Sequence, residues 1–166
     1  MIRVANQKGL RNFQDLRRIA ISIFFLTFLL EIVFAALFLL FKDWLPTMYL
    51  DVNDLANSAD NTEVIIMAAE LIFVAAFFQI SDGLQVVVLG ALRGLQDVKI
   101  PTIITFIAYW IIGFPVSLYL GLYTPLRSTG IWIGLLAGLT ASAIMLYIRF
   151  NYMTKKLLGN TLKSIN

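Results

Sequence analysis

Long apolar stretches separated by short polar segments dominate the pattern of the chain. A helical membrane span needs about 20 mostly apolar residues, and four segments meet that length: about 19–41, 64–92, 102–122 and 131–148. A basic segment precedes the first span, but this span is longer than the apolar region of a typical signal peptide. We therefore predict an all-α integral membrane protein with four transmembrane helices.

Positive charges are distributed asymmetrically about these spans. Eleven of the 13 Lys and Arg residues lie before the first span, between the second and third, or after the fourth. The 42–63 segment carries five acidic residues and one lysine. By the positive-inside rule, we predict a multi-pass membrane protein with both termini cytoplasmic. The chain then divides into a cytoplasmic basic segment (1–18), a transmembrane portion (19–150) and a cytoplasmic basic tail (151–166).

Composition narrows the possible chemistry. Apolar residues make up 60% of the chain and charged residues 14%, with a mean hydropathy of +0.83, whereas soluble domains are about 45–50% apolar and 25% charged. The chain has no histidine and no cysteine, so catalytic triads and zinc motifs lack their usual residues. We predict a protein that is not an enzyme and holds no cofactor. Because its basic residues follow membrane topology, we expect a lipid bilayer as a partner and no nucleic acid.

Small residues and a proline predict how the spans pack. Small residues at four-residue spacing allow a neighbouring helix to approach closely, and two spans carry them: Gly130, Gly134, Gly138 and Ser142 in the fourth, and Gly90 and Gly94 in the second. Pro115 lies inside the third span, where proline removes a helical hydrogen bond and should kink the helix, freeing a carbonyl near Ile111. This bend serves either packing or conformational change.

A polar stripe interrupts the second span. Asp82 lies between apolar runs, where an ionised side chain costs about 2.5–3.5 kcal/mol on insertion scales. Gln79, Asp82 and Gln85 are three residues apart and therefore share one face of a helix. The glutamines alone would fit a hydrogen-bond network between helices. An ionisable carboxylate suggests proton or cation binding instead.

Two other carboxylates lie within the predicted spans. Glu31 is near the middle of the first span and has no visible partner on its own helix. A structural and a functional role are equally open for this second intramembrane carboxylate. Glu70 is near the outer boundary of the second span, and we expect it to be a solvated residue at the entrance.

Several motifs follow one another in an order and spacing typical of a transporter family. They are Asp82-x-x-Gln85, the LRG of Leu92–Gly94, the Tyr109–Trp110 to Gly113-x-Pro115 segment, and Gly130-x-Trp132-x-Gly134. Together with IRVANQKG at residues 2–9, they resemble NorM-like members of the multidrug and toxic compound extrusion (MATE) family. The resemblance covers nearly the whole chain, at the positions of helices nine to twelve.

The resemblance implies part of the C-terminal lobe of a twelve-helix MATE fold, in the bacterial inner membrane. Family members are antiporters that export cationic amphipathic drugs in exchange for Na⁺ or H⁺, so the expected substrates are cationic organic small molecules. A carboxylate on the tenth helix belongs to a cation site, and it corresponds to Asp82, which would also ligate Na⁺ in a Na⁺-coupled protein. Phe78 stands where that site has a tyrosine, and it keeps a ring for cation–π contact. The site also uses a glutamate of the seventh helix, so we expect helices one to eight in the same chain or in trans.

The expected site is therefore Asp82 with five neighbours: Phe78, Gln79, Gln85, Tyr109 and Trp110. The last two would either present aromatic faces to a lipophilic cation or serve packing. Two other functions remain open. A lipid-linked oligosaccharide flippase of the same superfamily should carry basic residues in its spans, whereas these span cores hold acids and no bases. A four-span assembly subunit would have no transport of its own. The choice between Na⁺ and H⁺ stays open.

Overall fold

The computed structural model describes residues 1–48 and 58–163, with side chains over 1–48 and 62–159. All regular structure in these residues is helical. Four helical segments are long and apolar enough to cross a membrane: Phe13–Phe41, Thr62–Gly94, Lys99–Tyr123 and Arg127–Gly159. The predicted all-α fold with four spans is thus confirmed. Asp51 and Asp54 of the acidic segment lie outside the described residues.

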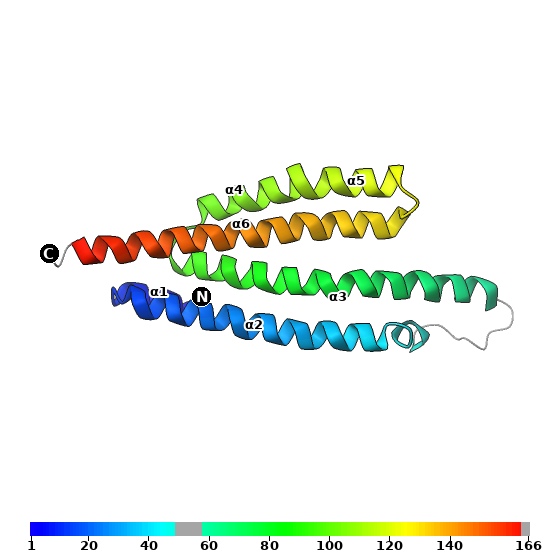
Figure 1. The fold of residues 1–166 in the computed structure, drawn as a ribbon, viewed down its shortest axis with the longest axis horizontal. Helices are drawn as coiled ribbons and strands as arrows, with labels where there is room; N and C mark the ends of the chain where they lie inside the picture. Colours follow the sequence, from blue (N-terminus) through cyan, green and yellow to red (C-terminus); the bar gives the residue numbers. More distant parts are fainter. Residues whose placement is uncertain (49–57, 164–166) are drawn as a thin grey trace.

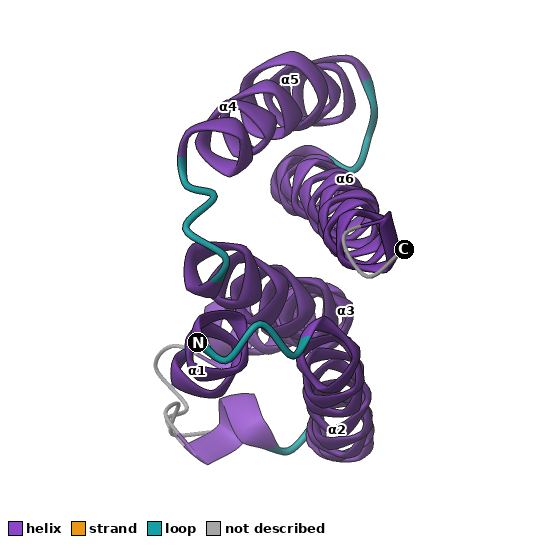
Figure 2. Ribbon diagram, turned by 90° about the vertical axis from the view of Figure 1, so that its left-hand side faces the viewer, coloured by secondary structure: helices purple, strands orange, loops and turns teal. Residues whose placement is uncertain are grey.

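The spans lie side by side, and neighbours in space are not always neighbours in sequence. The elements are α1 (Ile2–Gly9), α2 (Phe13–Phe41), the 3₁₀ turn η1 (Leu45–Met48), α3 (Ser58–Gly94), α4 (Lys99–Ile107), the π-helical turn η2 (Ala108–Gly113), α5 (Phe114–Tyr123) and α6 (Arg127–Lys163). Helix α2 packs on α3, α3 on α6, and α6 on α5 (Figures 1 and 2). Helices α2 and α5 run opposite to α3 and α6, which run in the same direction (Figure 1). Helix α6 therefore lies between the second and third spans.

The helices continue beyond the apolar stretches that predicted them. Helix α2 begins six residues before the predicted span, where the Asn12 side chain caps it by accepting a hydrogen bond from the Asp15 backbone N–H, 3.2 Å away. Helix α6 continues through most of the predicted basic tail. The length of an apolar stretch predicts only the part of a helix that lies within the bilayer. Polar turns beyond the bilayer can remain helical in water, so the whole helix is longer.

One end of the array has a close-packed apolar core. Its buried side chains come from α1, α2, α3, the turn after α3, and α6: Val4, Leu16, Ala20, Phe24, Val88, Ala91, Leu92, Leu95, Leu146 and Phe150. Phe24 and Phe150 meet edge to face with ring centroids 5.1 Å apart. Many large apolar side chains elsewhere on the spans are exposed, which suits contact with lipid or with further helices.

Helices α5 and α6 meet through the predicted small residues. A Cβ added at Gly138 would lie 2.7 Å from the Gly113 Cα, and one added at Gly130 would lie 2.6 Å from the Leu120 carbonyl oxygen. Ser117 lies against Gly134 between them. The close approach predicted for the fourth span is confirmed. The pair in the second span is divided: a Cβ added at Gly94 would lie 2.9 Å from the Met1 carbonyl oxygen, whereas no described atom lies within 4 Å of the Cβ position of Gly90.

The third span is divided by a π-helical turn directly before Pro115. Residues Ala108–Gly113 form η2, and Pro115 lies in the first turn of α5. Proline has no N–H to donate, and its ring clashes with the carbonyl four residues earlier. A π turn, which bonds i to i+5, accommodates this break within a continuous helical path. The predicted disruption near Ile111 therefore takes the form of a π turn.

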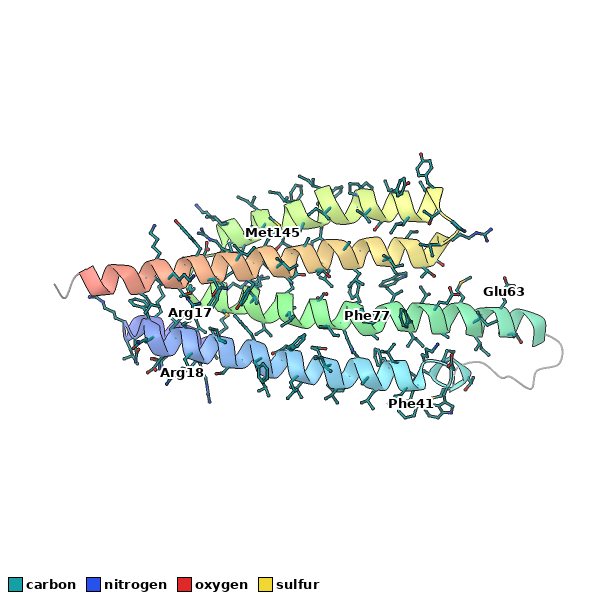
Figure 3. The ribbon with its side chains drawn as sticks, viewed as in Figure 1. Arg17, Arg18, Phe41, Glu63, Phe77 and Met145 are labelled. Atoms are coloured by element: carbon teal, nitrogen blue, oxygen red, sulfur yellow. The ribbon has the colours of Figure 1, made fainter. Side chains whose placement is uncertain are left out.

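The end that holds the apolar core is also the basic end. Figure 1 shows α1, the turn between α3 and α4, and the C-terminus gathered there. Polar contacts join these segments and the start of α2: Arg149 Nε to Asp97 Oδ2 (2.9 Å), Arg17 Nη2 to Asn151 Oδ1 (3.0 Å), and Lys8 Nζ to the Leu95 carbonyl oxygen (2.8 Å) and to Gln96 Oε1 (2.9 Å). Arg17 and Arg18 lie at this end, and Phe41 and Glu63 at the other (Figure 3).

Candidate functional site

The three polar residues of the predicted stripe have different surroundings on α3. Asp82 is exposed on the surface of the helical array. Gln79, one turn earlier, is half-buried, and its amide nitrogen is buried with no hydrogen-bond partner. Gln85 is buried. The stripe therefore runs from an open carboxylate to a side chain packed between helices.

Gln85 is used in contact between helices. The Tyr109 hydroxyl donates a hydrogen bond of 2.9 Å to Gln85 Oε1. Tyr109 belongs to η2, so this bond joins α3 to the π turn of the third span. A second polar contact joins α3 to α6, where the hydroxyls of Ser81 and Thr140 share a hydrogen bond of 2.9 Å. For Gln85 the geometry favours the structural alternative, a hydrogen-bond network between spans.

The predicted aromatic neighbours do not form one group. Phe78 packs edge to face on Trp132 of α6, with ring centroids 5.8 Å apart. Trp110 is 59% exposed, and its ring lies beside Phe106 and Phe114 of its own span. Successive helical residues diverge by about 100°, so Trp110 does not share the direction in which Tyr109 reaches Gln85. The structure brings Tyr109 and Gln85 together and directs Trp110 elsewhere.

Glu31 packs against α3 at the turn that carries Asp82. A Cβ added at Gly83 would lie 2.8 Å from Glu31 Cδ and 2.9 Å from Cγ, with the carboxylate oxygen Oε1 closer still. The carboxylate thus rests on the glycine backbone. Gly83 is not among the predicted site residues. The sequence feature that could have indicated it is a glycine directly after an intramembrane aspartate.

A separate cavity lies toward the opposite end of the array from the basic core. It has a volume of about 580 Å³. Its lining residues come from α3, from α6, and from the turns that follow α2 and precede α6: Lys42, Asp43, Ile66, Ala69, Glu70, Phe73, Val74, Phe77, Leu126, Thr129, Ile133 and Leu136. Thr129 donates a hydrogen bond of 3.3 Å to Glu70 Oε2. Phe77 is visible beside the ribbon of α3 in Figure 3. Asp82 is not among the lining residues.

Asp82 does not make a metal site by itself. Among the described residues, no group of three or more His, Cys, Asp or Glu side chains could hold a metal ion. A monovalent cation such as Na⁺ binds to oxygen ligands, and Asp82 offers two carboxylate oxygens on an open face. Further ligands would have to come from neighbouring groups.

Four helices long and apolar enough to cross a membrane define a multi-pass membrane protein. Two of these helices carry carboxylates within the membrane-spanning part. The profile of the MatE family matches residues 1–119, and the chain belongs to this family, as its NorM-like motifs predicted. It is 47% identical over 98 residues to the multidrug resistance protein NorM of Photobacterium profundum, covering 57% of this chain and 22% of that protein.

Other relatives extend the match to most of the chain. The multidrug resistance protein MdtK of Proteus mirabilis is 35% identical over 159 residues, which cover 93% of this chain and 33% of that protein. The multidrug resistance protein NorM of Burkholderia vietnamiensis is 42% identical over 112 residues, covering 68% of this chain and 23% of that protein. The chain thus spans a third or less of these relatives.

Proposed function

We propose that this chain forms part of a secondary active antiporter that exports cationic amphipathic drugs in exchange for Na⁺ or H⁺. Membership of the MatE family and the names of the relatives, multidrug resistance proteins, support a drug efflux transporter rather than an enzyme. The observation that carries the proposal is Asp82, an exposed carboxylate on a membrane-spanning helix. A group so costly to insert is retained for binding a charge.

In the proposed mechanism, Asp82 is the coupling carboxylate. A proton, Na⁺ and a drug cation compete for its single negative charge. Exchange follows when these ligands prefer different states, one open to the cytoplasm and one open to the outside. The exposed face of Asp82 would be covered by helices of the remaining transporter, in the same chain or in trans, which would add ligands to the site.

The neighbours of Asp82 have separate proposed roles. Gln79 would orient the carboxylate through its amide nitrogen, which has no partner among the described residues, or would offer a neutral oxygen. Gln85 and Tyr109 hold α3 against the third span. Phe78 would present a ring edge or face to a cation while it packs on Trp132. Trp110 would contact lipid or another helix rather than the cation.

Replacing Asp82 tests the proposal. In the complete transporter, Asp82→Asn should abolish ethidium uptake into everted vesicles whose lumen is loaded with Na⁺ and protons, because the amide cannot carry the exchanged charge. Membrane insertion should be unchanged. Glu70→Gln, on the same helix at the rim of the cavity, is the matched control and should retain efflux. Full transport by the Asp82→Asn variant would contradict the assignment.

A further inference from the structure

A second carboxylate reaches the turn of α3 that carries Asp82. Glu31 is half-buried on α2, and the end of its side chain lies on the backbone of Gly83. A residue with a Cβ at position 83 would displace this carboxylate. The absence of a side chain at Gly83 therefore creates the space in which the Glu31 carboxylate sits.

Asp82 and Gly83 are consecutive, so their Cα atoms are about 3.8 Å apart. Their side-chain directions diverge by about 100°, and in projection Gln79 lies between them. The buried amide nitrogen of Gln79 has no hydrogen-bond partner in the part of the chain that the structure describes, and an amide N–H donates well to a carboxylate. One turn of α3 thus has two acceptor groups around it, the carboxylates of Glu31 and Asp82. It also carries one donor without a described partner, the amide nitrogen of Gln79.

No basic residue offsets these charges within the predicted span cores. The charged side chains inside the predicted span cores are Glu31, Glu70 and Asp82, all acidic. The ion pair of Arg149 with Asp97 belongs to the basic end. Two carboxylates carried by neighbouring helices at one turn repel, and a bound cation relieves that repulsion. Their arrangement therefore favours capture of a positive charge.

We propose that Glu31 is a second carboxylate of the cation site, which acts through Asp82 to strengthen binding of the coupling cation. This inference rests on the proposed role of Asp82 and adds a helix, α2, to the site. Glu31 is a positioning residue in this scheme, because its charge acts on a cation held at Asp82. Its loss should weaken cation binding more than it slows transport at saturating cation.

The test is a titration of the coupling ion against the initial rate of ethidium efflux by the complete transporter. Glu31→Gln should raise the half-saturating concentration at least about tenfold, the effect expected for unit charges about 12 Å apart at an effective dielectric constant of ~20, and more for closer charges. The maximal rate should stay close to that of the parent protein. Gly83→Ala should shift the half-saturating concentration in the same direction, because its methyl group displaces the flexible carboxylate.

Gly90→Ala is the matched control for Gly83→Ala. Gly90 lies seven residues later, on the same face of α3, and nothing lies within 4 Å of its Cβ position. This variant should titrate like the parent protein. If Glu31→Gln does not insert into the membrane, the comparison of Gly83→Ala with Gly90→Ala tests the inference instead.

The outcomes separate this inference from the proposed function. Loss of coupling in Asp82→Asn, with unchanged half-saturation in Glu31→Gln and Gly83→Ala, would overturn the role of Glu31 alone. Coupling that survives in Asp82→Asn would overturn the proposed function instead. A fall in maximal rate without a shift in half-saturation would assign Glu31 a structural role and would also overturn the inference.

Discussion

The hydrogen bond from Tyr109 to Gln85 is the polar contact that joins the candidate stripe to the third span. Gln85 is only 7% exposed, so its amide oxygen depends on this hydroxyl for a partner. Hydrogen bonds between membrane helices contribute about 0.6 kcal/mol on average and up to about 1.7 kcal/mol. Leaving the buried acceptor unpaired costs about 1–3 kcal/mol.

Tyr109→Phe should therefore destabilise the chain by about 1 kcal/mol, toward the lower end of the range for an unpaired buried acceptor. The measurement is unfolding by SDS titration of the purified chain in mixed micelles. Gln85→Leu removes the acceptor, so Tyr109→Phe should cost less in that background than in the parent. Equal costs in both backgrounds would mean that the hydrogen bond contributes no net stability.

At the scale of the elements, the contact between α5 and α6 depends on glycines rather than on large side chains. The Cβ of an alanine at position 138 would lie 2.7 Å from the Gly113 Cα and 3.2 Å from the Ala108 carbonyl oxygen. Both are backbone atoms, so a side-chain rotation cannot relieve the clash. The helices would have to separate and lose dispersion contacts along the interface.

Gly138→Ala should destabilise the chain by about 1–3 kcal/mol, the usual cost of overpacking. The same SDS titration measures this loss. Gly159→Ala is the control, because Gly159 is exposed on the same helix with nothing within 4 Å of its Cβ position. It should be neutral or slightly stabilising, since alanine restricts the unfolded chain more than glycine does. Equal stability of the two variants would show that the close approach at Gly138 is dispensable.

Apolar length predicts the four spans well because the bilayer sets a minimum length for each helix. Helix ends are less predictable, since the cap at Asn12 and the polar turns of α6 extend helices without apolar residues. The spacing around Gly138 predicts a real interface. The same spacing at Gly90 does not, because helix packing depends on which face a partner approaches.

The candidate site is less predictable than the spans. The three-residue spacing of Gln79, Asp82 and Gln85 predicts that their side chains share a face of α3, but not which partner each side chain contacts. The contacts of Gln85 with Tyr109 and of Glu31 with Gly83 join residues of different spans. Their register depends on the rotation of each helix, which local sequence does not encode. Trp110 shows the same limit, because the residue next to Tyr109 points to a different surface.

At the scale of the whole molecule, the two ends of the array differ in charge and in packing. The basic end combines a buried apolar core with the ion pair of Arg149 and Asp97 and the hydrogen bond of Arg17 to Asn151. The Asp97 carboxylate is mostly buried beside its partner. This end is therefore tied together by both apolar and polar contacts, while the cavity with Glu70 lies toward the other end.

The proposed orientation can be tested with single cysteines, because the chain contains none. Glu63 and Lys155 are both exposed, on α3 near the acidic segment and on α6 at the basic end. The positive-inside rule places the basic end in the cytoplasm. In intact spheroplasts, a membrane-impermeant maleimide should label Glu63→Cys at once and Lys155→Cys only after permeabilisation. The reverse pattern would invert the topology and place the cavity that Glu70 lines on the cytoplasmic side. Labelling of both positions without permeabilisation would indicate dual insertion, in which charge asymmetry does not fix the orientation of the chain.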